Sequence, residues 1–275
     1  MSCTFLFPVP FHPIAEYFHR KPLEGPNNSL FLANYDVEAI HTIVNTTPVV
    51  HVSFQPSDPS EGPFPAILPM IGQMGSFERP SAGLEDSLDC YLHGYVSSRM
   101  MKNAQSSAKG EELRGLPVTI AATKFDGMVL SLTPFSHSYN YRSVVLFGYA
   151  TPVTDKDEKM WAMELITDSV VPGRWDQTRV PPDAGELAST TILRVRIVSG
   201  SGKIREGEPH DDKKDLVRDD LVKKVWTGVV PVWQTVGEPV AGKANRVSET
   251  PEYLRDFRNG ENETNEKYAI EAAQE

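Results

Sequence analysis

The stretch VTIAATKFDGMVLSLTPFSHSYNYRSVVLFGY, residues 118–149, decides the fold class of this chain. Two alternating apolar runs, 118–125 and 128–133, flank Asp126-Gly127, a dipeptide that is typical of tight hairpin turns. A third apolar run follows at 144–149. The stretch therefore predicts neighbouring antiparallel strands, with a hairpin turn at Asp126-Gly127.

The hydrophobic pattern of the remaining chain predicts further strands at 49–54, 66–71, 88–94 and 192–198, and helices at about 98–107 and 155–171. No alternation of strand and helix recurs, so the sequence predicts a mainly β fold, an antiparallel β-barrel with flanking helices. We expect three parts along the chain: an extended, proline-rich N-terminal arm over 1–35, one domain over 36–235, and an acidic, helical or flexible C-terminal tail over 236–275.

Composition narrows the classes of partner. The chain has 275 residues, 40% of them apolar, and a net charge of −10. We expect no nucleic-acid partner, because no basic stripe is visible. No apolar run approaches the ~18–20 residues of a membrane span, so we also expect no membrane partner. Cys3 and Cys90 form no Cys-x-x-Cys pair, which favours a reducing compartment, the cytoplasm. Residues 248–275 carry eight acidic and three basic side chains, the pattern of a solvated tail.

A candidate anion site lies at Ser97-Ser98-Arg99, where a predicted helix follows directly after a strand. The first turn of a helix has unpaired backbone N–H groups and the positive end of the dipole. Serine hydroxyls add donors, and arginine can bind two phosphate oxygens. Lys102 lies on the same helical face. The alternative is an ordinary serine cap with bases that face solvent.

Two histidines lie in suggestive places. His93 ends a strand beside Gly94, where a ligand can approach the backbone closely. His137 lies in a polar cluster and is a candidate general acid or base, although the sequence favours a plain hydrogen-bonding role for it. The seven histidines have no ligand spacing, so we expect no metal site. The sequence has no Gly-x-Ser-x-Gly nucleophile elbow, no Walker loop and no Gly-x-Gly-x-x-Gly motif that opens a helix.

Several pieces, in order, resemble a known family. They are Phe125-Asp126-Gly127-Met128-Val129-Leu130, His137-Ser138-x-Asn140-Tyr141-Arg142-Ser143, Pro172-Gly173-Arg174-Trp175, Lys203-x-Arg205-x-Gly207-x-Pro209 and Trp226-x-Gly228-Val229-Val230-Pro231. Together with Leu92-His93-Gly94 and Ser98-Arg99, this set is similar to the pyridoxamine 5′-phosphate oxidase-related flavin-nucleotide-binding proteins. The similarity spans residues 35 to 232.

The resemblance implies an FMN-binding split β-barrel, a homodimer with two flavins at the subunit interface. The strand at 67–70 would lie along the flavin ring, and the start of the helix would hold the phosphate. Residues 140–143 would approach from the neighbouring strand or from the other subunit. The cofactor-binding residues implied in this way are Ile67, Leu68, Pro69, Met70, His93, Gly94, Ser97, Ser98, Arg99, Lys102, Asn140, Tyr141, Arg142, Ser143, Lys203 and Arg205.

Three functions remain open on this reading. The first is an FMN-dependent oxidoreductase that acts on a small organic molecule, with His137 as the candidate catalytic residue. The second is a non-catalytic flavin or haem binding protein. The third is a split-barrel pocket repurposed for a non-redox biosynthetic step, because fold and cofactor do not fix a reaction.

Overall fold

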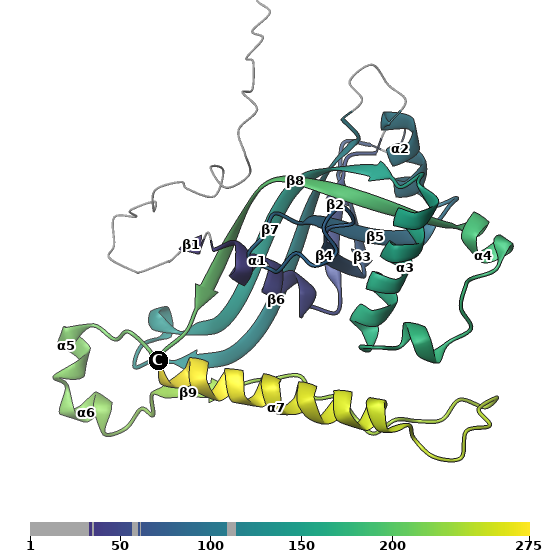
Figure 1. Cartoon of the computed structure of the whole chain (residues 1–275). Helices are drawn as coiled ribbons and strands as arrows, with labels where there is room; N and C mark the ends of the chain where they lie inside the picture. The colour runs from purple at the N-terminus through teal and green to yellow at the C-terminus, as the bar shows by residue number, and fades with distance from the viewer. Residues whose placement is uncertain (1–32, 35, 57–59, 61, 109–113) are drawn as a thin grey trace, which may run out of the picture.

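The computed structural model describes residues 33–34, 36–56, 60, 62–108 and 114–275 (Figure 1). The predicted N-terminal arm lies almost wholly outside the described residues. Within them, nine strands form one antiparallel sheet. The strands are β1 (Ala33–Asn34), β2 (Val50–Phe54), β3 (Ala66–Met70), β4 (Gly72–Gly75), β5 (Asp89–Tyr95), β6 (Leu116–Leu130), β7 (Ser138–Pro152), β8 (Thr190–Arg205) and β9 (Gly228–Pro231).

The main path of the sheet runs β3-β2-β6-β7-β8-β5-β4, with β1 paired to β8 and β9 paired to β6. Only Ile71 separates β3 from β4, so the chain itself connects the two ends of this path. The mainly β, antiparallel barrel-like fold predicted from the sequence is confirmed, although the ladder of strands is not closed by hydrogen bonds between β3 and β4.

Two helices supply part of the barrel core. Helix α1 (Val37–Asn45) begins at Asp36, whose side chain accepts from the N–H of Glu38, and it buries Ile40, Ile43 and Val44. Helix α2 (Arg99–Ser107) buries Met100, Met101 and Ala104. These side chains pack in one cluster with the inward residues of the strands, which alternate with outward residues along each strand.

A third helix covers the outer face of the β4–β5 edge. Helix α3 (Lys156–Val170) begins at Asp155, whose carboxylate accepts from the N–H groups of Asp157 and Glu158. Its Ala162 and Ile166 pack with Tyr91 and Ile192 in a second buried cluster. The short helix α4 (Ala184–Ser189) then leads into β8.

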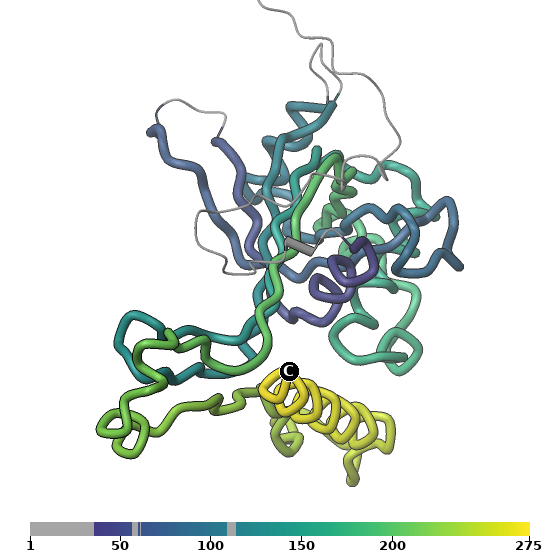
Figure 2. Tube along the Cα trace, turned by 90° about the vertical axis from the view of Figure 1, so that its left-hand side faces the viewer, coloured from purple at the N-terminus to yellow at the C-terminus, as the bar shows by residue number. Residues whose placement is uncertain are grey.

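Strands β6, β7 and β8 are 15, 15 and 16 residues long, so they extend well beyond the barrel (Figures 1 and 2). We call this extension the arm. Strand β9 pairs with the outer end of β6, after the short helices α5 (Lys213–Leu216) and α6 (Asp219–Val222). Helix α7 (Glu252–Gln274) packs against β6 and β9 and buries Ala269 and Ala272, so this part of the C-terminal tail is helical and one of its faces is not solvated.

The predicted hairpin turn at Asp126-Gly127 is also wrong. Strand β6 continues through both residues, and the extra residue is absorbed as an irregularity between Phe125 and Gly127. A buried ion pair holds Asp126, and β9 packs against Gly127, where an added Cβ would lie 2.9 Å from Val229 Cγ1. The reversal occurs about eight residues later, at the 3-10 turn Pro134–Ser136.

The sequence pattern also missed two short strands. Strand β4 lies in a stretch that reads as a turn-rich loop, because it begins and ends with glycine. Close packing explains Gly72, since a Cβ there would lie 2.9 Å from Val50 Cγ2 and 3.0 Å from Leu92 Cδ2. Strand β9 lies beyond the last strand that the pattern predicts.

Candidate functional site

The start of α2 has the features of an anion site. Ser98 is the N-cap residue with extended backbone, but its side chain makes no capping hydrogen bond. Its hydroxyl therefore remains a donor beside the unpaired N–H groups of the first helical turn. The Arg99 guanidinium lies 5.9 Å from the centroid of the Phe54 ring. Ser97, Arg99 and Lys102 are exposed.

On the outer face of the barrel, the described residues leave apolar side chains of β3 and β7 exposed. Phe54 lines a hollow of about 340 Å³ together with Phe147. The strand register places Ile67, Ser53, Thr119 and Phe147 in one row across four strands. Ile67 is 63% exposed and Phe147 45% exposed, which is unusual for such side chains and is typical of a surface that receives a ligand or a partner.

Strand β3, which the family resemblance places along the flavin ring, has an unpaired edge within the described structure. It stands at the end of the sheet path and pairs only with β2 among the described strands, so one edge of its backbone is open. Pro69 lies on this strand, as expected for a proline that cannot donate to a second neighbour. Side chains along β3 alternate between half-buried Leu68 and Met70 and exposed Ile67 and Pro69.

His93 lies on β5, opposite Ile192 of β8. Its Nδ1 atom is buried and has no hydrogen-bond partner among the described residues. Burial lowers the pKa of the imidazole, so the neutral form predominates at neutral pH. An added Cβ at the adjacent Gly94 would lie 2.5 Å from Met101 Cε, so the glycine allows α2 to pack closely on the strand.

The polar residues of β7 lie on the arm. Asn140 is fully buried, and its amide donates to the carbonyl oxygens of Gly207 at 3.2 Å and Ala272 at 3.0 Å. Arg205 donates to the side-chain oxygen of Asn140. Lys203 Nζ lies 5.7 Å from the centroid of the Tyr141 ring, and the Ser143 hydroxyl donates to the Lys203 carbonyl at 3.2 Å.

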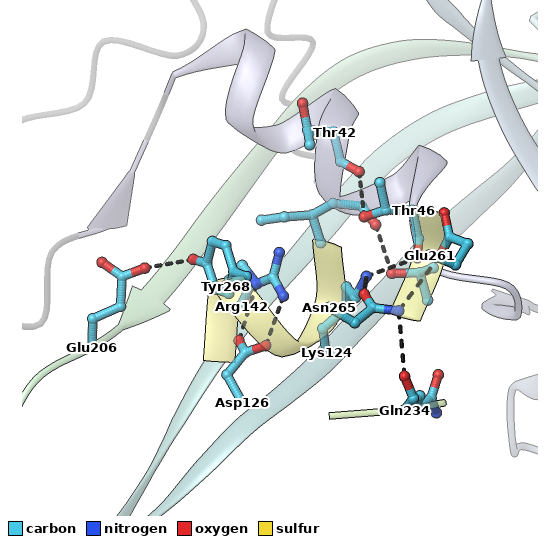
Figure 3. Close-up of polar contacts among 12 residues, drawn as sticks. Thr42, Thr46, Lys124, Asp126, Arg142, Glu206, Gln234, Glu261, Asn265 and Tyr268 are labelled. Carbon is cyan, nitrogen blue, oxygen red and sulfur yellow. Dashed lines mark hydrogen bonds and ion pairs between the residues drawn. The ribbon is translucent and has the colours of Figure 1, made fainter. Parts of the chain in front are cut away.

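Arg142 forms the centre of a buried network that docks α7 (Figure 3). Its Nε and an Nη donate to the two carboxylate oxygens of Asp126, at 3.0 and 2.6 Å. Its guanidinium also lies 3.4 Å from the centroid of the Tyr268 ring, and the Tyr268 hydroxyl donates to Glu206. These interactions attach the C-terminal helix to the strands that carry the predicted cofactor residues.

The predicted site residues therefore fall into two groups within one chain. The first group, on β3, β5 and α2, lies at the barrel, and the second, on β7 and β8, lies on the arm beside the C-terminus (Figures 1 and 2). His137 belongs with neither group. It is exposed in the turn at the tip of the arm, where Nδ1 contacts the Thr133 carbonyl at 2.9 Å.

The sequence did not predict two clusters of charged side chains, one around Lys124 and one around Arg194. Lys124 lies in a cavity between the barrel and the C-terminal segment, which only the position of α7 reveals. In the second cluster, Arg194 bridges Glu78 at 3.0 Å and Glu158 at 3.2 Å, and the buried Tyr91 hydroxyl donates to Glu158. Burial raises the pKa of neighbouring Asp89 to about 6, against the opposing effect of Arg194.

Among the described residues, no group of three or more His, Cys, Asp or Glu side chains could hold a metal ion. Within the same part of the chain, none of the helices combines the length and the apolar character that crossing a membrane requires.

The chain belongs to the pyridoxamine 5′-phosphate oxidase family, whose model matches residues 36–204. Among solved structures, the flavocytochrome Anf3 from Azotobacter vinelandii is similar at a TM-score of 0.65 and 26% identity, over 82% of this chain and 92% of that one. The FAD and haem binding protein from Mycobacterium smegmatis is similar at a TM-score of 0.63 and 24% identity, over 80% of this chain and 94% of that one. No curated protein sequence matches the chain. The resemblance found from the sequence motifs is thus confirmed at the level of the family.

Proposed function

We propose that this protein binds FMN and acts as an FMN-dependent oxidoreductase on a small organic molecule. The observation that carries the proposal is the start of α2, where Ser98 caps the helix without using its hydroxyl and Arg99 and Lys102 follow on the exposed side. A phosphate monoester is the ligand that such donors suit best. Membership of the family supports a flavin nucleotide as its source.

The neighbouring surface fits the rest of the cofactor. The open edge of β3 offers backbone groups to the polar edge of a flavin ring, and the exposed Ile67 and Phe147 offer apolar contact. When bound, the flavin supplies reversible hydride transfer, and the protein supplies orientation and hydrogen bonds. The residues of this chain would hold the phosphate at α2 and exclude water from the ring.

We further propose that the working unit is a homodimer. Residues that the family resemblance assigns to one cofactor lie at two ends of the long strands, so one chain does not bring them together. A second copy related by a two-fold axis would place the arm of each chain near α2 of the other. Ile67 on β3 and Phe147 on β7, which the described residues leave exposed, are side chains that such a partner would bury.

The experiment is reconstitution with FMN followed by anaerobic mixing with candidate reductants, NADH, NADPH and dithionite. We expect a yellow protein whose visible flavin absorbance is bleached by at least one nicotinamide reductant and recovers with an electron acceptor. A protein that binds FMN but is reduced by dithionite alone would favour a non-catalytic carrier. A protein that takes up no FMN would refute the proposal.

Haem binding is the second candidate, and His93 favours it. Its imidazole is half-buried, burial favours its neutral form, and Nδ1 has no hydrogen-bond partner among the described residues; histidine is a common axial ligand of haem iron. The proteins from A. vinelandii and M. smegmatis, whose folds are similar, are a flavocytochrome and an FAD and haem binding protein. Reconstitution with haemin should give a Soret band that His93→Gln abolishes. A band that is identical in this variant would remove His93 as the ligand.

A further inference from the structure

A cavity of about 540 Å³ lies between the barrel and the C-terminal segment. One wall consists of residues 47–49 at the end of α1, residues 123–126 of β6 and Arg142 of β7. The other wall consists of residues 232–234 and Asn265 of α7. The family match ends at residue 204, so the second wall belongs to the part of the chain beyond that match.

Lys124 brings a positive charge to this cavity (Figure 3). Its amino group donates to the Thr46 carbonyl at 3.2 Å and to the Asn265 side-chain oxygen at 3.3 Å, and both acceptors are neutral. Burial lowers the pKa of the amine, as does the nearby charge of Arg142, whereas Glu261 and Asp126 act in the opposite direction. A half-buried ammonium group with neutral acceptors is stabilised by an added anion.

The other charges around Lys124 are already engaged. The carboxylate of Asp126 receives two hydrogen bonds from Arg142, so each neutralises the other. Glu261 and Lys124 both line an adjacent cavity of about 420 Å³, but the described structure has no ion pair between them, and the Glu261 carboxylate lies 3.5 Å from the amide nitrogen of Asn265. Among the described residues that line this cavity, the charged side chain without a direct ion pair is therefore that of Lys124.

The walls around the amine are apolar and partly aromatic. They include Pro48, Val49, Phe125, Val232 and Trp233. Val49, directly before β2, and Phe125 of β6 line this cavity and are each 44% exposed. Flat aromatic walls favour a planar ring, because stacked or edge-to-face ring pairs add to the effect of apolar burial.

We propose that this cavity binds a small planar aromatic acid, with the acid group at Lys124 and the ring between Phe125 and Trp233. The site is additional to the proposed flavin site, and its occupation does not require flavin. Strand β6 and the C-terminal segment form it together, so its existence depends on the docking of α7 against the arm.

The test compares two probes that share one ring system, 8-anilinonaphthalene-1-sulfonate, which is an anion, and N-phenyl-1-naphthylamine, which is neutral. Fluorescence titrations use the full-length, flavin-free protein. In Lys124→Met we expect the affinity for the sulfonate to fall by about tenfold or more, the scale of a charged hydrogen bond, with the neutral probe unaffected. Lys124→Arg, which keeps the charge, should retain sulfonate binding, and so should Lys267→Met on the exposed face of α7.

Trp233→Ala tests the opposite wall and should weaken both probes. Three outcomes would overturn the proposal: sulfonate affinity that is unchanged in Lys124→Met, an equal loss for both probes in that variant, or no saturable binding of the sulfonate. Displacement of the Lys124-dependent sulfonate by excess FMN would also overturn it, because the cavity would then belong to the flavin site. Lys124→Arg and Trp233→Ala keep the test decisive if Lys124→Met does not fold.

Discussion

The buried pair of Arg142 and Asp126 allows a quantitative prediction about how α7 is held. The side chains are 11% and 6% exposed, and two hydrogen bonds of 3.0 and 2.6 Å connect them. Arg142→Met keeps the length of the side chain but leaves the Asp126 carboxylate buried without a cation. Such a loss costs about 3–5 kcal/mol of unfolding free energy. The substitution also removes the stacking of the guanidinium on Tyr268.

Urea unfolding followed by circular dichroism measures this cost. The double variant Asp126→Asn/Arg142→Met removes the isolated charge and should be more stable than Arg142→Met alone, by about 1–3 kcal/mol. Lys223→Met, which breaks an exposed pair with Asp219, should change stability by less than about 1 kcal/mol. Arg142→Met should also speed proteolytic removal of α7. A loss below about 1 kcal/mol, or a double variant that is simply the sum of both singles, would refute the reasoning.

Three further predictions concern the cofactor site, the acidic cluster and the turn at the tip of the arm. Arg99→Ala should weaken FMN binding by about 1.5–3 kcal/mol in a fluorescence titration, whereas Arg218→Ala on α6 should not, and equal affinities would remove Arg99 from the site. Because burial raises the pKa of Asp89 to about 6, the folded state binds a proton that the unfolded state releases near pH 4, so stability should fall as pH rises from about 4 to 6. Asp89→Asn should reduce that fall by up to about 3 kcal/mol in urea unfolding, and a pH profile identical to that of the unsubstituted protein would contradict the assignment. His137→Gln should leave FMN affinity unchanged and lower kcat if His137 is a general acid or base, and an unchanged kcat would end that role.

The sequence predicted helix starts and the position of an edge strand, because both depend on a few adjacent residues. Ser98 occupies the N-cap position of α2, and the Asp155 side chain caps α3, because a helix start depends on two or three adjacent residues. The end position of β3 in the sheet likewise follows from Pro69, which cannot donate to a second strand.

Long-range contacts explain the failure at Asp126-Gly127. The dipeptide favours a turn locally, but Asp126 pairs with Arg142, sixteen residues later, and Gly127 faces β9, which begins about a hundred residues later. These contacts keep the strand extended, and the irregularity at Phe125 absorbs the extra residue. A dipeptide signal carries no information about either partner.

The two candidate sites, at the start of α2 and at Lys124, differ in the same way in how far the sequence predicts them. The start of α2 was predictable from a few adjacent residues, because helix geometry creates the donors. The cavity at Lys124 was not, since Lys124 and Asn265 are 141 residues apart in the sequence. For the same reason the sequence identified the donors on β7 but not the helix that packs on Asn140 and Arg142.

Complementation between two chains is the most direct test of the central claim, that α2 of one chain and the arm of its partner hold one flavin. Arg99→Ala and Lys203→Ala should each weaken FMN binding strongly. Mixed in equal amounts under conditions that allow exchange of subunits, they should restore tight binding at roughly one quarter of the sites, because half of the dimers are then mixed and each carries one intact site. No restoration on mixing, with exchange verified, would contradict a site that two chains share.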